Sequence, residues 1–226
     1  MKYLIIGFDD NTVYDRKAVE LLNKYNIKGT FYINSGTLND SGFLTKEELD
    51  ILFDGHEVAS HTVNHLRLKE LTHQGIKYEI EEDFEILKSY SKQDTRGFAY
   101  PFGDYNKKVK DMAKECGVSY ARTVKGTKKF DRPKDLLEWH PTMHLTGMAW
   151  DTKDFERVQK GFNFCLDKLE DFLEDYNAEL FHVWLHSWEF KDDKEKWDML
   201  ERFFRLISNE EDIISVTASE YIKEIS

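Results

Sequence analysis

The sequence contains little cysteine and little proline. Cys116 and Cys165 are its two cysteines among 226 residues, and neither belongs to a CxxC pair. A disulfide-stapled scaffold is therefore not expected, and a reduced, intracellular setting fits. The three prolines, together with the lack of low-complexity tracts or fixed-period repeats, indicate one compact domain over residues 1–226.

Long hydrophobic runs are also missing. The apolar run near the start, YLIIGF at 3–8, is about a quarter of a membrane span and leads directly into acidic residues. We expect no membrane insertion and see no signal peptide. As written, the chain is expected to be cytoplasmic, or extracytoplasmic if an export segment is missing from the given chain.

Basic residues are outnumbered by acidic ones. The chain has 32 Lys and Arg against 43 Asp and Glu, which gives a formal net charge of −11. Nucleic acids and anionic membrane surfaces would be repelled by this balance. We therefore expect no nucleic-acid partner, and the oligomeric state stays open.

Short apolar runs alternate with amphipathic helical patterns along the whole chain. Strands are predicted at 3–8, 30–34, 57–60, 97–100, 120–124, 180–186 and 213–216, with an irregular one at 139–145. Helical patterns lie between most of them, and two capping boxes begin at Thr45 and Thr217. The sequence predicts an α/β fold, a distorted (β/α) barrel with seven or eight mainly parallel strands.

Candidate site residues lie at the carboxyl ends of four of these strands. Asp9 and Asp10 follow the first, His61 follows the third, Pro101 and Phe102 follow the fourth, and His186 ends the strand at 180–186. In such a fold the carboxyl ends of the strands meet at one rim, where catalytic groups collect. The sequence therefore predicts one site at this rim.

The residue types at this rim suit a metal. Burying two adjacent carboxylates together is costly unless a cation or hydrogen bonds compensate. His61 and His65 are four residues apart, a spacing that aligns the two rings if the segment is helical. One carboxylate and two imidazoles suit zinc with open coordination positions, and iron is the alternative. A turn pair of acids and chance surface histidines remain the simpler interpretation.

Four stretches resemble the ordered motifs of a known family. They are GFDD at 7–10, GHEVASHTVNH at 55–65, AYPFGDYN at 99–106 and VWLH at 183–186. By these motifs the chain resembles the polysaccharide deacetylase family, the NodB-homology domain of carbohydrate esterase family 4. The resemblance runs from residue 3 to the last helix.

The resemblance assigns roles to individual residues. It implies that Asp10, His61 and His65 bind a divalent metal, with zinc expected first and cobalt, nickel or iron as alternatives. It also implies that Asp9 is the general base that takes a proton from metal-bound water. His186 would be the general acid.

Two further residues receive roles from the same comparison. The backbone N–H of Phe102 matches the family's oxyanion donor. Leu185 matches the apolar wall around the acetyl methyl group.

Two departures from the family pattern affect how the catalytic groups are held. Ala99 stands where the family usually has an arginine that holds the catalytic aspartate, and Arg122 is the expected replacement, with Arg96 second. The simpler interpretation of Arg122 is a surface charge pair. The stretch from Asp135 to Trp139 resembles the family's Asp-Trp motif with Glu138 in place of the acid. An alternative alignment leaves neither acid to orient His186.

Several other residues are candidates for substrate contact. Trp139, Trp184 and Trp188 could form a stacking wall for a sugar ring, with core packing as the alternative. Pro101 is placed beside the substrate with Phe102. Among the remaining histidines, His140 and His144 are the two whose strand end could reach the rim. Glu189 is expected to be solvated.

The expected activity is metal-dependent removal of N-acetyl, or O-acetyl, groups from a carbohydrate, with N-acetylglucosamine-containing material as the substrate. One alternative is hydrolysis of a small non-sugar amide or ring C–N bond on the same fold. The other is a carbohydrate-binding module without turnover.

Overall fold

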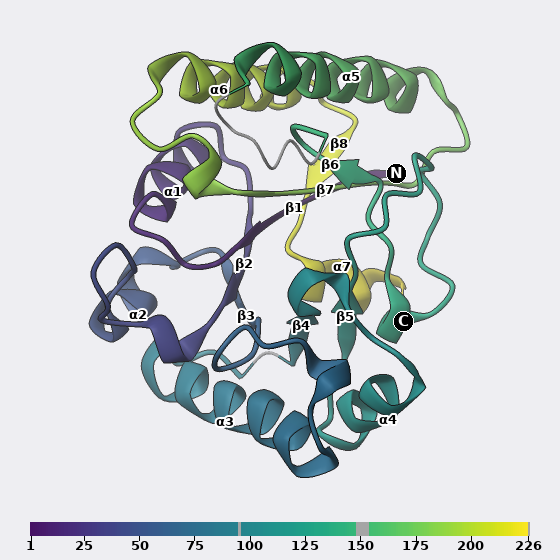
Figure 1. Cartoon of the computed structure of the whole chain (residues 1–226). Helices are drawn as coiled ribbons and strands as arrows, with labels where there is room; N and C mark the ends of the chain where they lie inside the picture. The colour runs from purple at the N-terminus through teal and green to yellow at the C-terminus, as the bar shows by residue number, and fades with distance from the viewer. Residues whose placement is uncertain (95, 148–153, 226) are drawn as a thin grey trace.

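The computed structural model describes residues 1–94, 96–147 and 154–225. At its centre lies one sheet in which every pairing is parallel, with the order β5-β4-β3-β2-β1-β7-β6, and β8 pairs with the start of β1 (Figure 1). The strands are β1 (Lys2–Asp9), β2 (Thr30–Ile33), β3 (Glu57–Ser60), β4 (Gly97–Ala99), β5 (Tyr120–Arg122), β6 (Met143–His144), β7 (Leu180–His186) and β8 (Ile213–Ser215). The prediction of a barrel-like α/β fold with seven or eight parallel strands is confirmed.

Helices surround this curled sheet: most cover its outer face, and the last one packs against its inward-facing residues through Ala218 and Tyr221. The helices are α1 (Asp15–Lys24), α2 (Leu49–Leu52), α3 (His73–Ser91), α4 (Lys107–Glu115), α5 (Phe155–Glu174), α6 (Lys194–Ser208) and α7 (Ala218–Ile225). In Figure 1, α5 and α6 lie at the top and α3 and α4 at the bottom of the view. None of the helices in the described ranges is long and apolar enough to cross a membrane.

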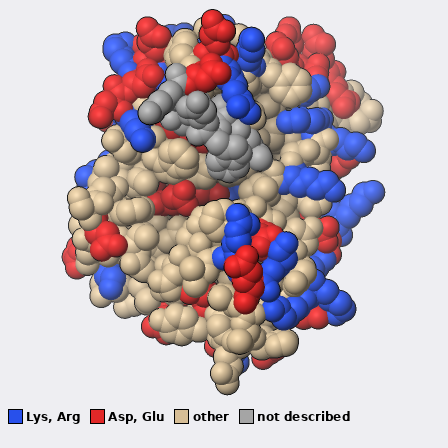
Figure 2. Space-filling view, viewed as in Figure 1, with Lys and Arg blue, Asp and Glu red and all other residues tan. Residues whose placement is uncertain are grey.

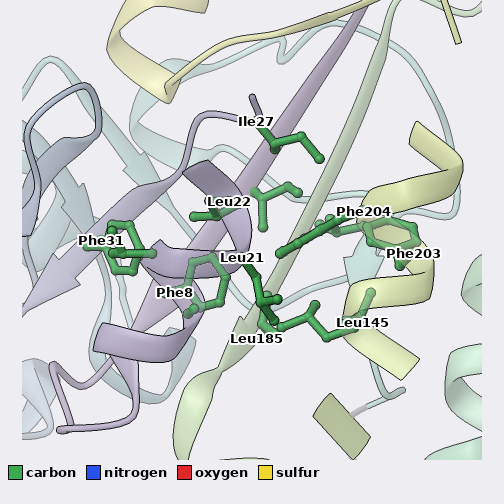
Figure 3. Packing of buried hydrophobic residues seen from close by; sticks show 14 of the residues in the cluster. Phe8, Leu21, Leu22, Ile27, Phe31, Leu145, Leu185, Phe203 and Phe204 are labelled. Atoms are coloured by element: carbon green, nitrogen blue, oxygen red, sulfur yellow. The ribbon is translucent and has the colours of Figure 1, made fainter. Parts of the chain in front are cut away.

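Side chains alternate between the two faces of the central strands, which separates two environments. Outward-facing residues such as Phe8 and Leu185 pack with Phe203 of α6 in a helix-covered hydrophobic core (Figure 3). Inward-facing residues form a second cluster that includes Tyr32 and Trp139. The concave interior is therefore filled by side chains, several of them aromatic, below the rim where the strands end.

The local helix signals appear as the sequence predicts. Thr45 and Glu48 form a capping box, with the Thr45 backbone N–H donating to Glu48 Oε2 at 2.8 Å. Thr217 and Glu220 make the same reciprocal pair, with N–O distances of 2.9 and 3.2 Å. These caps fix where the chain enters α2 and α7.

The segment from His61 to His65 is not helical, which corrects the expectation of a helical alignment of the two rings. Thr62 and His65 have φ values of 70° and 52°, in the left-handed region. The segment is therefore a turn, and this turn brings the two rings to an edge-on contact with centroids 4.8 Å apart.

Candidate active site

The end of β1 supplies two carboxylates that point in different directions. Asp9 lies within the strand in register with Tyr32 of β2 and His186 of β7, and it is 2% exposed. Asp10 follows with φ 80°, held by a hydrogen bond from its N–H to the Tyr32 carbonyl at 3.2 Å. This left-handed residue turns the Asp10 side chain toward the rim, with 23% of it exposed.

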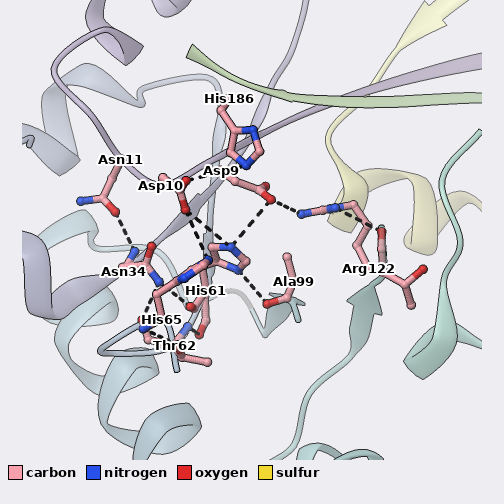
Figure 4. Close-up of polar contacts among 12 residues, drawn as sticks. Asp9, Asp10, Asn11, Asn34, His61, Thr62, His65, Ala99, Arg122 and His186 are labelled. Carbon is pink, nitrogen blue, oxygen red and sulfur yellow. Dashed lines mark hydrogen bonds and ion pairs between the residues drawn. The ribbon is translucent and has the colours of Figure 1, made fainter. Parts of the chain in front are cut away.

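Asp10, His61 and His65 converge as a set of potential metal ligands. Asp10 Oδ1 lies 3.8 Å from His61 Nε2 and 3.6 Å from His65 Nε2. The three ligand atoms all lie within 4.8 Å of one another. Figure 4 shows the two imidazoles on the same side of the Asp10 carboxylate.

His61 is oriented by its backbone surroundings. Its Nδ1 lies 2.8 Å from the Ala99 carbonyl and donates to it, which leaves the Nε2 lone pair facing Asp10. Burial lowers the pKa of His61 to about 4, although the neighbouring Asp9 acts in the opposite direction. At neutral pH the imidazole is therefore uncharged, as a metal ligand must be.

The turn that carries His65 is held by side chains from other elements. Asn34, just after β2, donates to the Thr62 carbonyl at 3.1 Å. Asn64 is clamped by Glu79 of α3, through its backbone N–H at 2.8 Å and its side-chain amide at 2.7 Å. These contacts stabilise a backbone conformation that costs roughly 1–3 kcal/mol per strained residue.

Arg122 makes an ion pair with Asp9, in the place that the sequence predicts for it. Both side chains are buried, and the Arg122 guanidinium donates to Asp9 Oδ2 (Figure 4). Burial would raise the pKa of Asp9, but the positive charge of Arg122, with His61 and His186, lowers it below its ordinary value. Asp9 is therefore ionised at neutral pH. Arg96 pairs with Glu85 instead, at 3.7 Å.

Glu189 is buried, so the expectation that it is solvated is wrong. It ends the short 3₁₀ helix η6 (Ser187–Glu189) and is 5% exposed. Its Oε1 lies 2.8 Å from His186 Nδ1 and 3.0 Å from His144 Nε2. The sequence offers one sign of this contact, an acid three residues after His186, but the approach of His144 depends on the pairing of β6 with β7.

The stretch from Asp135 to Trp139 does not reach His186. Asp135 and Glu138 both pair with Lys110 of α4, and Glu138 Oε1 lies 3.7 Å from His140. His140 itself contacts Thr123, with Nδ1 2.7 Å from the hydroxyl oxygen. Of the two histidines singled out in the sequence, only His144 lies at the site.

Trp188 contacts both the metal-ligand set and a cavity beside it. Its indole Nε1 donates to Asp10 Oδ2 at 2.9 Å, and its ring lies 4.7 Å from that of His186. The 400 Å³ cavity is also lined by Phe43, Lys191 and His65. Figure 2 shows acidic atoms recessed in the hollow middle of this face, among mostly uncharged residues.

Two predicted substrate contacts are contradicted by burial. Trp139 is 1% exposed and packs against Tyr120 and Tyr221 in the interior, so it offers no face to a sugar. Leu185 is fully buried among the outer helices, because it alternates with the inward-facing His186 along β7 (Figure 3).

Trp184 takes the inward position next to His186 instead of Leu185. Its ring lies 4.5 Å from the guanidinium of Arg122 and 4.5 Å from the ring of His144. At 1% exposure it packs beneath the acid–base groups and does not form part of an open wall.

The turn after β4 brings Phe102 to the rim. Pro101 is buried at the start of η4 (Pro101–Gly103), so it shapes the turn and offers no surface to a substrate, which corrects its predicted role. Phe102 has φ 58° and is 47% exposed, with its ring 4.5 Å from that of His65. The turn thereby carries the Phe102 backbone to the edge of the metal-ligand set.

The donor set fits a divalent transition metal. One carboxylate and two neutral imidazoles leave coordination positions open, and Zn²⁺ accepts these ligand types. His61 is oriented by Ala99 and Asp10 by Trp188, as outer contacts of metal ligands commonly are. Beside the set lie an ionised carboxylate, Asp9, and a hydrogen-bonded imidazole, His186.

Comparison with known solved structures shows the same fold. The Xyl-CE4 domain of a multidomain xylanase from the hindgut metagenome of Trinervitermes trinervoides superposes with a TM-score of 0.68 at 17% identity, covering 99% of this chain and 91% of that one. A family 4 acetyl xylan esterase from Clostridium thermocellum, in complex with a cobalt ion, gives 0.66 at 16% identity, with 99% and 91% coverage.

Comparison of sequences identifies the family. A peptidoglycan-N-acetylglucosamine deacetylase from Bacillus cereus is 28% identical over 118 residues, which are 51% of this chain and 54% of that protein. The chain spans about half or less of the length of the curated relatives it matches. The family model for polysaccharide deacetylase matches residues 1–121, which include both aspartates, both histidines of the turn and Phe102. The chain belongs to the polysaccharide deacetylase family.

Proposed function

We propose that this protein is a metal-dependent hydrolase that removes acetyl groups from an N-acetylated carbohydrate. The observation that carries the proposal is the convergence of Asp10, His61 and His65 beside Asp9 and His186. The names of two relatives support it, a deacetylase of peptidoglycan N-acetylglucosamine and an esterase found with a cobalt ion. N-acetylglucosamine-containing oligo- or polysaccharide is the proposed substrate class.

The metal would be held by Asp10, His61 and His65. A divalent ion bound there would lower the pKa of water and polarise the acetyl carbonyl. The site's own residues must then accept one proton, donate another and stabilise a negative oxygen. We propose zinc for this position, with cobalt, nickel or iron as alternatives.

Asp9 is suited to accept the proton from the attacking water. It is ionised, buried and anchored by Arg122, and its Oδ2 lies 3.7 Å from His61 Nε2, beside the ligand set. A carboxylate fixed in this way needs little reorganisation when the proton arrives.

His186 faces Asp10 Oδ2, whereas the two ligand histidines face Asp10 Oδ1. His186 is suited to donate a proton to the leaving amine. Burial lowers the pKa of its imidazole, but the Glu189 carboxylate and the two aspartates outweigh burial and raise it to about 9. The ring is therefore protonated at neutral pH, and its Nε2 lies 3.7 Å from Asp10 Oδ2. The backbone N–H of Phe102 is the proposed donor to the oxyanion, a contact typically worth roughly 3 kcal/mol of barrier.

The test measures acetate released from a panel of N-acetylated chito-oligosaccharides. Release should stop with a chelator and return with added zinc. Release only from small non-sugar amides would replace the carbohydrate with the alternative substrate class. Binding of the oligosaccharides without any release would indicate a carbohydrate-binding module.

Two variants separate metal binding from turnover. Asp9→Asn should keep the metal and lose turnover, because it removes the proton acceptor but no ligand. His61→Ala should lose both, because it removes a ligand. Equal metal content in the wild type and His61→Ala would remove this ligand assignment.

A further inference from the structure

The end of β7 carries a buried carboxylate whose two oxygens are both engaged. Glu189 Oε1 faces His186 Nδ1 at 2.8 Å and His144 Nε2 at 3.0 Å, and Oε2 accepts from the Thr146 hydroxyl at 2.9 Å. The four residues come from η6, the end of β7, and β6 with the loop after it. All four are 6% exposed or less.

The hydrogen-bond roles in this cluster can be assigned from Glu189. The pKa of Glu189 lies well below its usual range, because His144 and His186 outweigh the effect of burial, so the group is a carboxylate and can only accept. His186 Nδ1 must therefore donate to it. The other nitrogen of the ring, Nε2, is then the one that faces Asp10 and the reaction site.

His144 supports the same assignment independently. Its Nδ1 lies 3.2 Å from the backbone nitrogen of Thr146 and accepts from its N–H, so the ring proton is on Nε2. This nitrogen lies 3.0 Å from Glu189 Oε1, an electrostatic contact and not an aligned hydrogen bond. Two imidazoles and one hydroxyl thus converge on one carboxylate. Contacts with His186, His144 and the Thr146 hydroxyl together restrict the side-chain conformation of Glu189.

No other acid takes this place among the residues that the structure describes around His186 Nδ1. Asp135 and Glu138, which the sequence offers for the task, are held by Lys110. Asp10 lies on the Nε2 side of the ring, and Asp9 is paired with Arg122. Within the described ranges, Glu189 is an acid in direct contact with Nδ1, at 2.8 Å.

We infer that Glu189 is the positioning residue for His186, holding the imidazole with Nε2 toward the substrate, and that His144 and Thr146 hold Glu189 in turn. The inference rests on the proposed function, since it assigns His186 the transfer of a proton to the leaving amine. It places the support of the acid on the same loop as Trp188, and not on the stretch from Asp135 to Trp139.

The main test compares Glu189→Gln with the wild type in acetate release from N-acetylated chito-oligosaccharides. The glutamine side chain has nearly the volume of glutamate but carries no charge. One of its two terminal atoms donates hydrogen bonds, whereas both carboxylate oxygens only accept them. We expect kcat to fall between tenfold and about 10⁴-fold, within the range typical of general acid–base groups. KM should stay within about twofold and the bound metal should stay at the wild-type level, because the ligands and the cavity are untouched.

The matched control is Glu57→Gln. Glu57 is also buried and hydrogen-bonded, to Tyr120 at 2.9 Å and to the Ser219 backbone N–H at 2.9 Å, but it lies at the start of β3, away from the rim. It should keep the wild-type kcat. An equal fall of kcat in both variants would indicate a general effect of opening the core and would overturn the inference.

Thr146→Val decides the question if Glu189→Gln does not fold. This isosteric change removes the hydroxyl donor to Glu189 without touching either partner of the Glu189–His186 pair, and kcat should fall severalfold at constant KM. An unchanged kcat in a folded Glu189→Gln would overturn the inference and leave the deacetylase proposal standing. Loss of one bound metal ion in that variant would do the same, because Glu189 would then be a metal ligand. A wild type that releases no acetate from any substrate would remove the proposed function and the inference together.

Discussion

At the scale of single residues, the buried pair of Arg122 and Asp9 is a strong determinant of both stability and chemistry. Arg122 is fully buried and also stacks over Tyr32, with the guanidinium 4.9 Å from the ring centroid. We expect Arg122→Met to lower the free energy of unfolding by about 3–5 kcal/mol, because it leaves the Asp9 charge buried and unpaired. Urea denaturation of the metal-free protein measures this loss.

The double variant Arg122→Met/Asp9→Asn tests the cause of that loss. Removing the stranded charge should return part of the stability, so the double variant should be more stable than Arg122→Met alone. If the double variant is the less stable of the two, the cost comes from packing around Tyr32 and not from the charge.

A second prediction at this scale concerns Trp188. Trp188→Phe keeps an aromatic face but loses the indole N–H that donates to Asp10. Metal affinity should fall by about 10–100-fold, as is typical when an outer contact of a ligand is removed. Competition with a chromogenic chelator measures it. Trp197→Phe, which removes an indole N–H bonded to the Lys191 carbonyl, should leave the metal affinity unchanged.

At the scale of elements, α3 is tied to the rim through a buried acid. Asp83 accepts a hydrogen bond from the Ser35 backbone N–H at 2.9 Å, and burial raises its pKa to about 7. The folded protein therefore keeps a proton on Asp83 between about pH 4 and pH 7 that the unfolded chain has released. The contribution of Asp83 to stability must decline as the pH rises through this window, by roughly 1.4 kcal/mol per unit at most.

Asp83→Asn tests this dependence. In the presence of chelator, the difference in unfolding free energy between Asp83→Asn and the wild type should shift in favour of the variant from pH 4.5 to pH 7 and level off above it. Asp198→Asn, at an exposed ion pair with Lys194, should run parallel to the wild type. Parallel curves for Asp83→Asn as well would show that Asp83 does not titrate in this range.

The strands were predictable because their signals are local. The continuous apolar runs of β1 and β7 and the four residues of β3 were located to within a residue or two. The turn from His61 to His65 was not, because Thr62 and His65 adopt left-handed backbone angles without glycine, under constraint from Asn34 and Glu79.

The sequence motif also failed to predict which side chains of β7 face the site. Alternation along the strand places Trp184 and His186 on one side and Leu185 on the other, which a motif read as consecutive letters does not reveal. The burial of Glu189 was not predicted for another reason. Its partners His144 and Thr146 come from β6 and the loop after it, some 40 positions earlier, a contact that only the folded chain creates.

At the scale of the whole molecule, the proposed metal joins distant parts of the chain. Asp10 follows β1 and the two histidines follow β3, so a bound ion links segments about fifty residues apart. Zinc at 100 times its Kd should add about 2.7 kcal/mol to the unfolding free energy. For a chain of this size the melting temperature should then rise by about 5–10 °C.

Differential scanning fluorimetry with zinc and with chelator measures that shift. His61→Ala should abolish it, whereas His73→Ala, an exposed histidine at the start of α3, should preserve it. A shift that survives in His61→Ala would place the stabilising ion elsewhere in the molecule.

Asp9 and His186 occupy the same rung of two adjacent, parallel strands. The separation of their backbones is therefore the interstrand spacing of any β-sheet, about 4.8 Å, and no insertion or deletion in the surrounding loops can alter it. The loops that carry Phe102 and Trp188 can differ in shape and so admit different sugars. The backbones of the proposed proton acceptor, Asp9, and the proposed proton donor, His186, keep the same separation. A graft of foreign loops onto this sheet should accordingly change which substrate is accepted without the need to realign the acid and the base.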